Sequence, residues 1–418
     1  MLPCGHFQGI PMTRLHVDFI LPCDPSMTVI HHGAIVFDKT ILDLGDGGAM
    51  EARYPDATPV VAPKGSVALP GLVNPHVHLE FSANQGVLDF GAFVPWLQSV
   101  IAHREALQEA ATSEVIEEAI ASMLRTGTTA FGAISSFGLE LDACVNTPAR
   151  VVFFTELLGS RPDAVDILFN DFKQRLRGAY ERENSRFKAA LSIHSPYSTH
   201  PILAKNALDI ARRENLVVST HFMESKAERL WLDEGKGDFA GFFKGFSPHA
   251  VPLCSGLEYV RLFQGTRTLF THGVHASLPE LDAIAAQGGS ITHCPVSNRL
   301  LGTGTLALDP VFERGIPLTL GTDGLSSNIS LSLWDEMRSA LFAHSNIPLN
   351  TLAKTLLHSA TAQNANALGL NAGVLESGKV ADIIVMPLSG ATSANLPLHL
   401  VLHAQAPSHI FIEGSALC

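Results

Sequence analysis

The stretch "PGLVNPHVHLEFS", residues 70–82, runs an apolar strand into two histidines, His76 and His78. Because successive side chains of a strand point to opposite faces, positions two residues apart share a face. Both imidazoles therefore emerge side by side, and two neutral imidazoles on one rigid face supply half of a metal site. A polar strand end with two chance histidines explains the isolated pattern equally well, so the rest of the chain has to decide between these interpretations.

Seven further apolar, β-rich segments follow this one, and segments with a helical period separate them. The eight predicted strands are GLVNPHVHLE (71–80), TTAFGAI (128–134), RVVFFTELLG (150–159), KAALSIHSP (188–196), LVVSTHFME (216–224), TLFTHGVH (268–275), SITHCPVS (290–297) and PLTLGTDG (317–324). Helical segments include SEVIEEAIASMLRTG (113–127), HPILAKNALDIARREN (200–215) and SLPELDAIAAQG (277–288). Because apolar strands that alternate with helices form a parallel sheet covered on both faces, eight repeats predict an α/β protein with a (β/α)8 TIM barrel.

Both ends of the chain have a different texture, with short β-segments separated by Gly, Pro and Asp turns. The segments are LHVDFILP (15–22), TVIHHGAIVFD (28–38) and SVALP (66–70) at the N-terminal end, and GKVADIIVMP (378–387), LPLHLVLHA (396–404) and PSHIFIEG (407–414) at the other. We expect residues 1–68 and 371–418 to build one small β-sandwich domain and residues 69–370 to form the catalytic barrel. The first eleven residues show no periodicity, so Met12 is a plausible alternative start.

Composition excludes several classes of function. The 418 residues are 46% hydrophobic and 16% charged, as in a globular protein with a large core. A net charge of -12 and the absence of a basic run make nucleic acid and anionic membranes poor partners. Six scattered cysteines without a C-x-x-C pair indicate neither a disulfide framework nor a thiolate zinc site. With no signal peptide or bilayer-spanning run, we expect a cytoplasmic protein.

Polar residues stand where six of the predicted strands end. They are His76, His78, His194, His221, His272, His293 and Asp323. In a barrel of this kind the C-terminal strand ends meet at the active site, so residues far apart in sequence share one pocket. Any one of these histidines would more often be an ordinary strand-end residue than a ligand. Six such strand ends at one mouth favour a catalytic site.

The imidazoles of His76, His78 and His221 and the carboxylate of Asp323 suit one divalent ion, with Zn²⁺ as the first choice. Fe²⁺ would accept the same ligands. An ion of this kind brings the pKa of water from about 15.7 towards roughly 7, which supplies hydroxide at neutral pH. Glu224 stands three residues beyond His221, where its carboxylate can enter the pocket and carry a proton. The ordinary alternative for a loop glutamate is a solvated charge.

These residues resemble the amidohydrolase superfamily, and specifically its mononuclear deaminase branch. The resemblance covers nearly the whole chain, through PGLVNPHVH, SIHSPYS, HFMES, THGVHAS, HCPVSN and GTDG. Binuclear members of the superfamily commonly carry a carboxylated lysine at strand four, where this chain has His194. The resemblance implies that Glu224, His272 and Asp323 are catalytic: Glu224 shuttles protons, His272 positions the hydrolytic water, and Asp323 takes its proton while also binding the metal. The same resemblance assigns His76, His78 and His221 as the other metal ligands.

Within this branch the chain is most similar to deaminases of adenosine-type nucleosides, in which a tryptophan precedes a ribose-binding glutamate by nine residues. Trp96 and Glu105 have that spacing in WLQSVIAHRE, while Arg161 in ELLGSRPD and the strand-four His194 match residues that contact the nucleoside. Glu105 and Arg161 have an ordinary alternative as surface charges. The segments NPHVHLEFSANQG and FVPWL resemble, more narrowly, the aminofutalosine deaminases of menaquinone biosynthesis. Where many relatives have a lysine after SN, this chain has Arg299, which could serve a carboxylated tail.

The leading hypothesis is hydrolytic deamination of a 6-aminopurine nucleoside, with 6-amino-6-deoxyfutalosine as the best candidate, giving futalosine and ammonia. The loop LDEGKGDFAGFFKGFSPH (232–249), with Phe239, Phe242, Phe243, Phe246, Lys236 and Lys244, would either fold over an aromatic acid or pack on the barrel rim. Adenosine, methylthioadenosine, S-adenosylhomocysteine and guanine remain alternative substrates. A non-catalytic structural barrel is a further alternative, but such proteins usually lose metal ligands. The expected partner is a small nucleoside, and the sequence leaves a homo-oligomer open.

Overall fold

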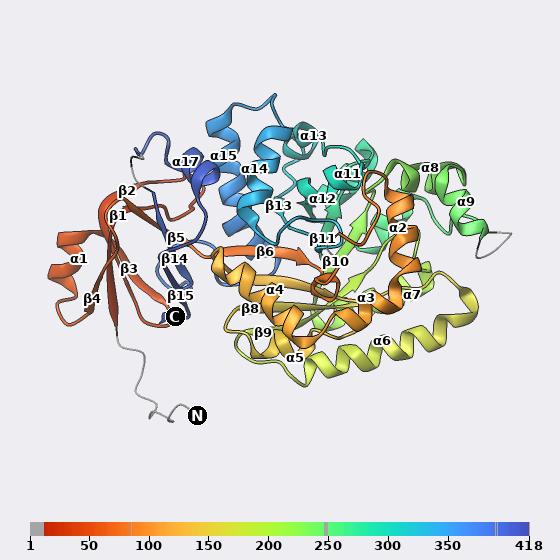
Figure 1. Ribbon diagram of the computed structural model, residues 1–418, viewed down its shortest axis with the longest axis horizontal. Coiled ribbons are helices and arrows are strands. Elements are labelled where there is room, and N and C mark those ends of the chain that lie inside the picture. The colour runs from red at the N-terminus through yellow and green to blue at the C-terminus, as the bar shows by residue number, and fades with distance from the viewer. Residues whose placement is uncertain (1–11, 85, 246–249, 389, 391, 418) are drawn as a thin grey trace.

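Eight parallel strands form the centre of the molecule and lie where the sequence predicts them (Figure 1). The computed structural model describes residues 12–84, 86–245, 250–388, 390 and 392–417. The barrel strands are β6 Leu72–Val77, β7 Thr128–Ser135, β8 Arg150–Leu157, β9 Phe187–Ile193, β10 Val217–Phe222, β11 Arg267–His272, β12 Ser290–His293 and β13 Leu318–Leu320. They follow one another in chain order, each parallel to the next. The predicted (β/α)8 barrel is therefore confirmed.

Helices surround these strands and cover their outer faces (Figure 1). They are α2 Phe93–Ala102, α3 Arg104–Ala110, α4 Ser113–Arg125, α5 Leu141–Asn146, α6 Val165–Tyr180, α7 Pro201–Glu214, α8 Lys226–Glu234, α9 Asp238–Lys244, α10 Gly256–Leu262, α11 Leu278–Ala286, α12 Pro295–Leu300, α13 Leu308–Glu313, α14 Leu333–Ala343, α15 Leu349–His358 and α16 Asn364–Ala367, with short turns η1 Leu79–Phe81, η2 Pro162–Ala164 and η3 Ser359–Gln363. Capping residues fix several helix starts; Thr112, for example, accepts from the backbone N–H of Val115 before α4. The three helical segments predicted from the sequence correspond to α4, α7 and α11.

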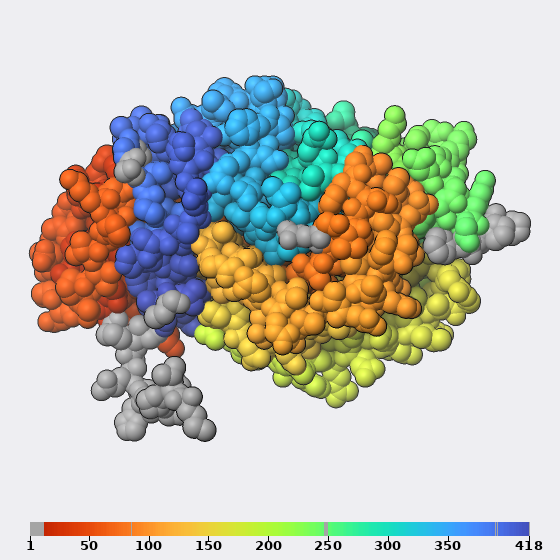
Figure 2. All heavy atoms as spheres, viewed as in Figure 1, coloured from red at the N-terminus to blue at the C-terminus, as the bar shows by residue number. Residues whose placement is uncertain are grey.

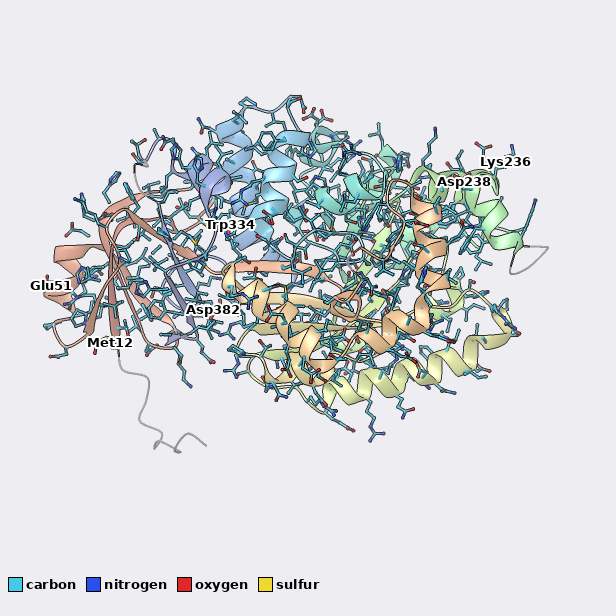
Figure 3. The ribbon with its side chains drawn as sticks, in the orientation of Figure 1. Met12, Glu51, Lys236, Asp238, Trp334 and Asp382 are labelled. Carbon is cyan, nitrogen blue, oxygen red and sulfur yellow. The ribbon has the colours of Figure 1, made fainter. Side chains whose placement is uncertain are left out.

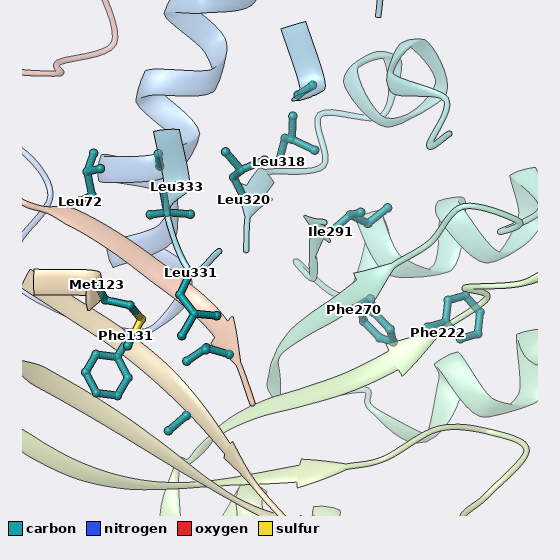
Figure 4. Packing of buried hydrophobic residues seen from close by; sticks show 14 of the residues in the cluster. Leu72, Met123, Phe131, Phe222, Phe270, Ile291, Leu318, Leu320, Leu331 and Leu333 are labelled. Carbon is teal, nitrogen blue, oxygen red and sulfur yellow. The ribbon is translucent and has the colours of Figure 1, made fainter. Parts of the chain in front are cut away.

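The barrel core lies between the strands and their helices. Figure 4 shows part of this apolar cluster, in which Phe222 on β10 and Phe270 on β11 pack edge to face with ring centroids 5.8 Å apart. Leu318 and Leu320 contribute from β13. Because a tightly packed interior holds the strands in one geometry, the barrel provides a rigid base for the loops at its C-terminal end.

Side chains help to join β6 and β13, the first and last strands of the barrel, along a seam. Asn74 Nδ2 donates to Thr322 Oγ1 at 2.7 Å. Asn364 donates to the carbonyl oxygens of both Val73 and Leu320, and its own side-chain oxygen accepts from the N–H of Leu320. Asn364 therefore satisfies backbone groups of both edge strands that a ladder satisfies elsewhere in the barrel, and Asn74 adds a side-chain hydrogen bond across the same seam.

Strands from both ends of the chain form a second, mixed sheet beside the barrel, as the sequence predicts. Its strands are β1 Thr13–Ile20, β2 Ile30–Phe37, β3 Ile41–Asp46, β4 Thr58–Val61, β5 Ser66–Pro70, β14 Ile383–Pro387, β15 His409–Ile412 and β16 Ser415–Ala416, with the short helix α1 Gly47–Arg53 beside them. The two ends meet where β5 pairs antiparallel with β14. Figure 2 shows the C-terminal segment, in blue, between the N-terminal strands, in red, and the barrel.

One predicted strand is wrong. The segment LPLHLVLHA forms helix α17, Leu396–His403, rather than a strand. Its alternating leucines fit a strand, but Leu396, Leu400 and Val401 also lie on one helical face, and these three are buried. Pro397 stands in the first turn, where proline is tolerated because its missing N–H has no partner within the helix. Among the described residues, no helix is long and apolar enough to cross a membrane.

Candidate active site

Four side chains predicted as metal ligands meet at the C-terminal end of the barrel. His76 and His78 come from the end of β6, His221 from β10 and Asp323 from beyond β13, and their ligand atoms all lie within 4.8 Å of one another. His78 Nε2 lies 3.2 Å from His221 Nε2 and 3.5 Å from Asp323 Oδ1. All four residues are buried. The barrel thus brings together donors that are separated by up to 247 positions in the chain.

The geometry of these donors fits a divalent ion. His221 Nδ1 lies 3.0 Å from the carbonyl oxygen of His194 and donates to it, so Nε2 carries the lone pair. Two nitrogens that bind tetrahedral zinc lie roughly 3.3 Å apart, close to the 3.2 Å between His78 and His221. His76 Nε2 is buried and has no hydrogen-bond partner among the described residues. A metal would satisfy this nitrogen, since a buried polar atom otherwise loses its hydration without compensation.

Burial sets the protonation states of this cluster. It lowers the pKa of His78 to about 3 although Asp323 opposes the shift. Burial also lowers the pKa of His76 and of His221, and neighbouring histidines add to the effect. Burial raises the pKa of Asp323, but the nearby His78, His272 and His221 lower it by more. The pKa of this carboxyl is therefore below its ordinary value. At neutral pH the imidazoles are therefore neutral and the carboxylate is charged, which are the states that bind metal.

Glu224 and His272 stand beside this cluster. His272 Nε2 lies 3.6 Å from Glu224 Oε2, and together with Asp323 these two residues offer ligand atoms within 4.8 Å of one another. His272 Nδ1 donates to Asn298 Oδ1 at 2.9 Å, so its Nε2 is free to accept a hydrogen bond. Burial raises the pKa of Glu224 well above its ordinary value, and the nearby Asp323 and Glu228 add to the shift. Glu224 is therefore suited to hold a proton at neutral pH.

The backbone turns sharply where these residues leave their strands. Met223, His272 and Asp323 have φ angles of 48°, 74° and 60°, in the left-handed region that residues other than glycine seldom adopt. Each such residue costs on the order of 1–3 kcal/mol and persists where the surroundings enforce it. Here Glu228 accepts from the backbone N–H groups of both Met223 and Glu224, at 3.0 and 2.8 Å. The strained turn aims Glu224 and is held by a second buried acid.

Several polar residues of the site escaped sequence reasoning. Asp323 Oδ2 accepts from the hydroxyls of Ser297 and Ser327, at 2.8 and 2.9 Å, so both serines fix the carboxylate. Asn298 Oδ1 accepts from His272 Nδ1 and so fixes the orientation of this imidazole ring. Ser297 and Asn298 form the SN pair of the HCPVSN motif, whose role the sequence alone does not indicate. Ser327 has a weaker signal, four residues beyond Asp323.

His194 lies beside the metal cluster, on the side of β8 and β9. Its Nδ1 is 2.5 Å from Ser198 Oγ, and burial lowers its pKa to about 4. His194, His221 and the buried Glu156 on β8 form a second group with ligand atoms within 4.8 Å. Because His221 Nδ1 already donates to a carbonyl, His221 has only one nitrogen for a metal. Both carboxylate oxygens of the buried Glu156 already have partners, because they accept from Ser136 Oγ at 2.6 Å and from Ser192 Oγ at 3.2 Å.

The predicted nucleoside contacts are less tightly held. Trp96 on α2 donates from Nε1 to the carbonyl oxygen of Ser326 at 2.8 Å, which ties this helix to the loop after Asp323. Glu105 lies in the first turn of α3 and is exposed. Arg161 is also exposed, and its guanidinium forms two hydrogen bonds with the carboxylate of Asp163. The structure thus brings Trp96 to the mouth of the barrel and leaves Glu105 and Arg161 open to solvent.

The segment after β10 is helical where a loop was expected. Its residues 238–244 form α9, and Phe239 is fully buried against Phe93 and Tyr197, with ring centroids 6.0 and 4.7 Å away. Phe246 lies outside the described residues. Phe239 is therefore part of an aromatic cluster on the barrel rim, as the packing alternative proposed.

The sequence pattern of the amidohydrolase family matches residues 67–416, and the chain belongs to this family. The expectation drawn from the histidine and aspartate motifs is confirmed.

Relatives within the family are named as deaminases. The chain is 45% identical to the aminodeoxyfutalosine deaminase of a Nitratiruptor species, over 93% of this chain and 95% of that protein. It is 36% identical to a protein of Helicobacter pylori named adenosine deaminase, over 94% and 96% of the two lengths. The crystal structure of Helicobacter pylori aminofutalosine deaminase in complex with methylthio-coformycin superimposes with a TM-score of 0.93 at 35% identity, covering 97% of this chain and 100% of that one. The narrower resemblance to aminofutalosine deaminases is therefore confirmed.

Proposed function

We propose that this protein is a metal-dependent hydrolytic deaminase of a 6-aminopurine nucleoside. The preferred substrate is 6-amino-6-deoxyfutalosine, which it converts to futalosine and ammonia in menaquinone biosynthesis. The observation that carries the proposal is the buried pair of Glu224 and His272 beside three histidines and Asp323. The relative with 45% identity, named as an aminodeoxyfutalosine deaminase, supports the choice of substrate.

His76, His78, His221 and Asp323 would hold one divalent ion. Zn²⁺ suits the three imidazoles and one carboxylate best, and Fe²⁺ fits the same donors. When bound, the ion supplies a Lewis acid that makes water nucleophilic at neutral pH. Ser297 and Ser327 hold Asp323 Oδ2, which leaves Oδ1 towards the histidines.

The chain's own residues divide the proton transfers. His272 Nε2, free because Nδ1 donates to Asn298, accepts a hydrogen bond from the attacking water and orients it. Asp323 takes the proton that this water loses as it adds to C6 of the purine. Glu224 holds a proton because its pKa is raised, and it gives this proton to the ring nitrogen. It then takes the proton of the new C6 hydroxyl and delivers it to the departing amine. The proton held by Asp323, whose carboxylate lies within 4.8 Å of Glu224, restores Glu224 for the next turnover. The purine therefore leaves with oxygen at C6, and ammonia is released.

Residues outside the metal cluster, at the mouth of the barrel, would hold the nucleoside. His194 and Trp96 line this mouth, and Glu105 offers two carboxylate oxygens to the two ribose hydroxyls. Arg161 adds a contact to the nucleoside from the loop after β8. Because a site built to pair hydroxyls rejects analogues that lack them, these residues favour a nucleoside over a free base. A small nucleoside substrate and a location in the cytoplasm complete the proposal.

Steady-state kinetics of the metal-loaded enzyme test this function. We expect kcat/KM for aminofutalosine to exceed the values for adenosine, methylthioadenosine and S-adenosylhomocysteine, and guanine to be the poorest substrate. Preferential turnover of adenosine or methylthioadenosine would move the assignment to the related nucleoside deaminases. Preferential turnover of guanine would leave only the deaminase class.

A further inference from the structure

The proposed substrate carries an aromatic acid on its 5' side, and this acid needs a cation at the mouth of the barrel. Three candidates share their surroundings with other charged side chains. Lys236 pairs with Glu234 and lies at the outer edge of the molecule beside Asp238 (Figure 3). Arg161 is bound to a neighbouring carboxylate. Arg299 shares a pocket between α12 and α14 with the carboxylate of Asp335 and with a second cation, Arg338.

Arg104 differs from these three cations. It is the first residue of α3 and stands directly before Glu105, the residue proposed to bind ribose. Its guanidinium carbon lies 5.1 Å from the centroid of the Phe137 ring. Within the described residues no carboxylate forms an ion pair with it. Arg104 is thus a solvent-accessible cation that is held by an aromatic ring rather than neutralised by an acid.

Phe137 belongs to the mouth of the barrel because it follows the C-terminal end of β7. Its N–H donates to Glu80, as do the N–H groups of Ser136 and Leu139, and Glu80 lies two residues beyond His78. The loop that carries Phe137 is therefore tied to the strand that supplies two metal ligands.

The same loop also reaches the nucleoside side of the site. Ser136 Oγ donates to Glu156, which shares a cluster of donor atoms with His194 and His221. The loop that carries Phe137 is thus linked, through Ser136 and Glu156, to the side of the mouth on which His194 lies. Because Arg104 directly precedes Glu105 in α3, a group attached to a ribose held at Glu105 would lie near this guanidinium.

Resting on the proposed function, we propose that Arg104, stacked on Phe137, binds the carboxylate on the 5' side of the substrate. A guanidinium presents parallel N–H donors that match a carboxylate, and such charge-assisted pairs are stronger than neutral hydrogen bonds. The ring of Phe137 restricts the guanidinium before the substrate arrives, which lowers the entropy cost of binding. The side chain of Leu139, 44% exposed in the same loop, offers apolar surface to the aromatic ring of the acid.

Substituting Arg104→Gln in the metal-loaded enzyme tests this role. We expect kcat/KM for aminofutalosine to fall about 10- to 100-fold, mainly through KM, because a charge-assisted pair is lost. The value for methylthioadenosine, which has no carboxylate, should stay within about twofold since none of its contacts change. Arg104→Lys should recover part of the loss because it keeps the charge but not the planar donors.

Lys173→Gln is the matched control. Lys173 lies 5.1 Å over the ring of Phe169 on the outer helix α6, so this variant removes a cation over a ring at the same distance. The Lys173→Gln variant should have the same kcat/KM as the wild type for both aminofutalosine and methylthioadenosine. Equal losses on both substrates in Arg104→Gln, or no loss on either, would overturn the role of Arg104 while the substrate preference of the wild-type enzyme stands. A wild-type enzyme that does not prefer the acidic substrate would overturn the proposed function and this role together.

Discussion

The metal cluster and the nucleoside contacts lie at the same end of the barrel but are built differently. His76, His78, His221 and Asp323 are buried and lie at or just beyond strand ends, where the barrel core fixes the backbone. Glu105 and Arg161 lie on a short helix and a loop, open to solvent. The difference indicates that the fold determines the chemistry, whereas the segments between strand and helix determine which molecule undergoes it.

The largest expected effect is the loss of a strand-end ligand. His78→Ala should leave a folded protein with little bound metal and turnover near the limit of detection, because the large barrel core does not depend on the ion. Metal analysis and circular dichroism of the purified variant provide the measurement. Full activity with stoichiometric metal would remove His78 from the ligand set, and the buried strand ends would then not all serve the metal.

Glu224→Gln should have the next largest effect, since it retains size and polarity but cannot release a proton. Turnover should fall by roughly 10² to 10⁴, while metal content stays near that of the wild type. Single-turnover kinetics combined with metal analysis separate the two quantities. If metal is lost in proportion to the rate, Glu224 is a metal ligand rather than a proton carrier.

A smaller and more selective effect is expected on the exposed side. Glu105→Gln should reduce kcat/KM for aminofutalosine about 10- to 100-fold, because a charged hydrogen-bond acceptor for the ribose is lost. Metal content should not change. Glu109→Gln, at another exposed position of the same helix, is the matched control and should behave like the wild type. Equal behaviour of the two variants would show that α3 does not contact the nucleoside.

The smallest expected effect concerns the stability of the folded protein and involves the buried Glu228. Burial raises the pKa of Glu228 from 4.5 to about 7, so the folded protein binds more protons than the unfolded chain between these values. The free energy of unfolding should therefore fall as the pH rises from about 4.5 to about 7. Glu228→Gln should flatten this part of the curve of Tm against pH. An unchanged slope would mean that Glu228 is ionised in the folded protein throughout this range.

The sequence predicted the strand ends well because the barrel topology alone brings them together. His76 and Asp323 needed no further information once eight strands were recognised. The partners of these residues were harder to predict, because Ser327 and Asn298 acquire their roles only from how turns fold back on the strand ends. A sequence motif shows that such a residue is present, but it does not show which atom the side chain forms a hydrogen bond with.

Helix α17 shows a second limit of prediction from sequence, which is that periodicity alone can fit either a strand or a helix. Leucines at alternate positions satisfy the period of a strand, and some of the same leucines also satisfy the period of a helix. Packing against α15 and α14 decides the outcome, and that information lies elsewhere in the chain. The exposed charge of Arg161 is a similar case, because its pairing with Asp163 depends on the rotamer of a surface side chain.

The seam between β6 and β13 sets the order of events during synthesis. Asn74 bonds to a residue 248 positions away and Asn364 to one 291 positions away, so both contacts form only after nearly the whole barrel has left the ribosome. His76 and His78 are made early, but Asp323 joins them only when the seam closes. A nascent chain therefore holds an incomplete metal site until β13 and the residues just beyond it have been made, and the final ligand arrives together with the final strand of the barrel.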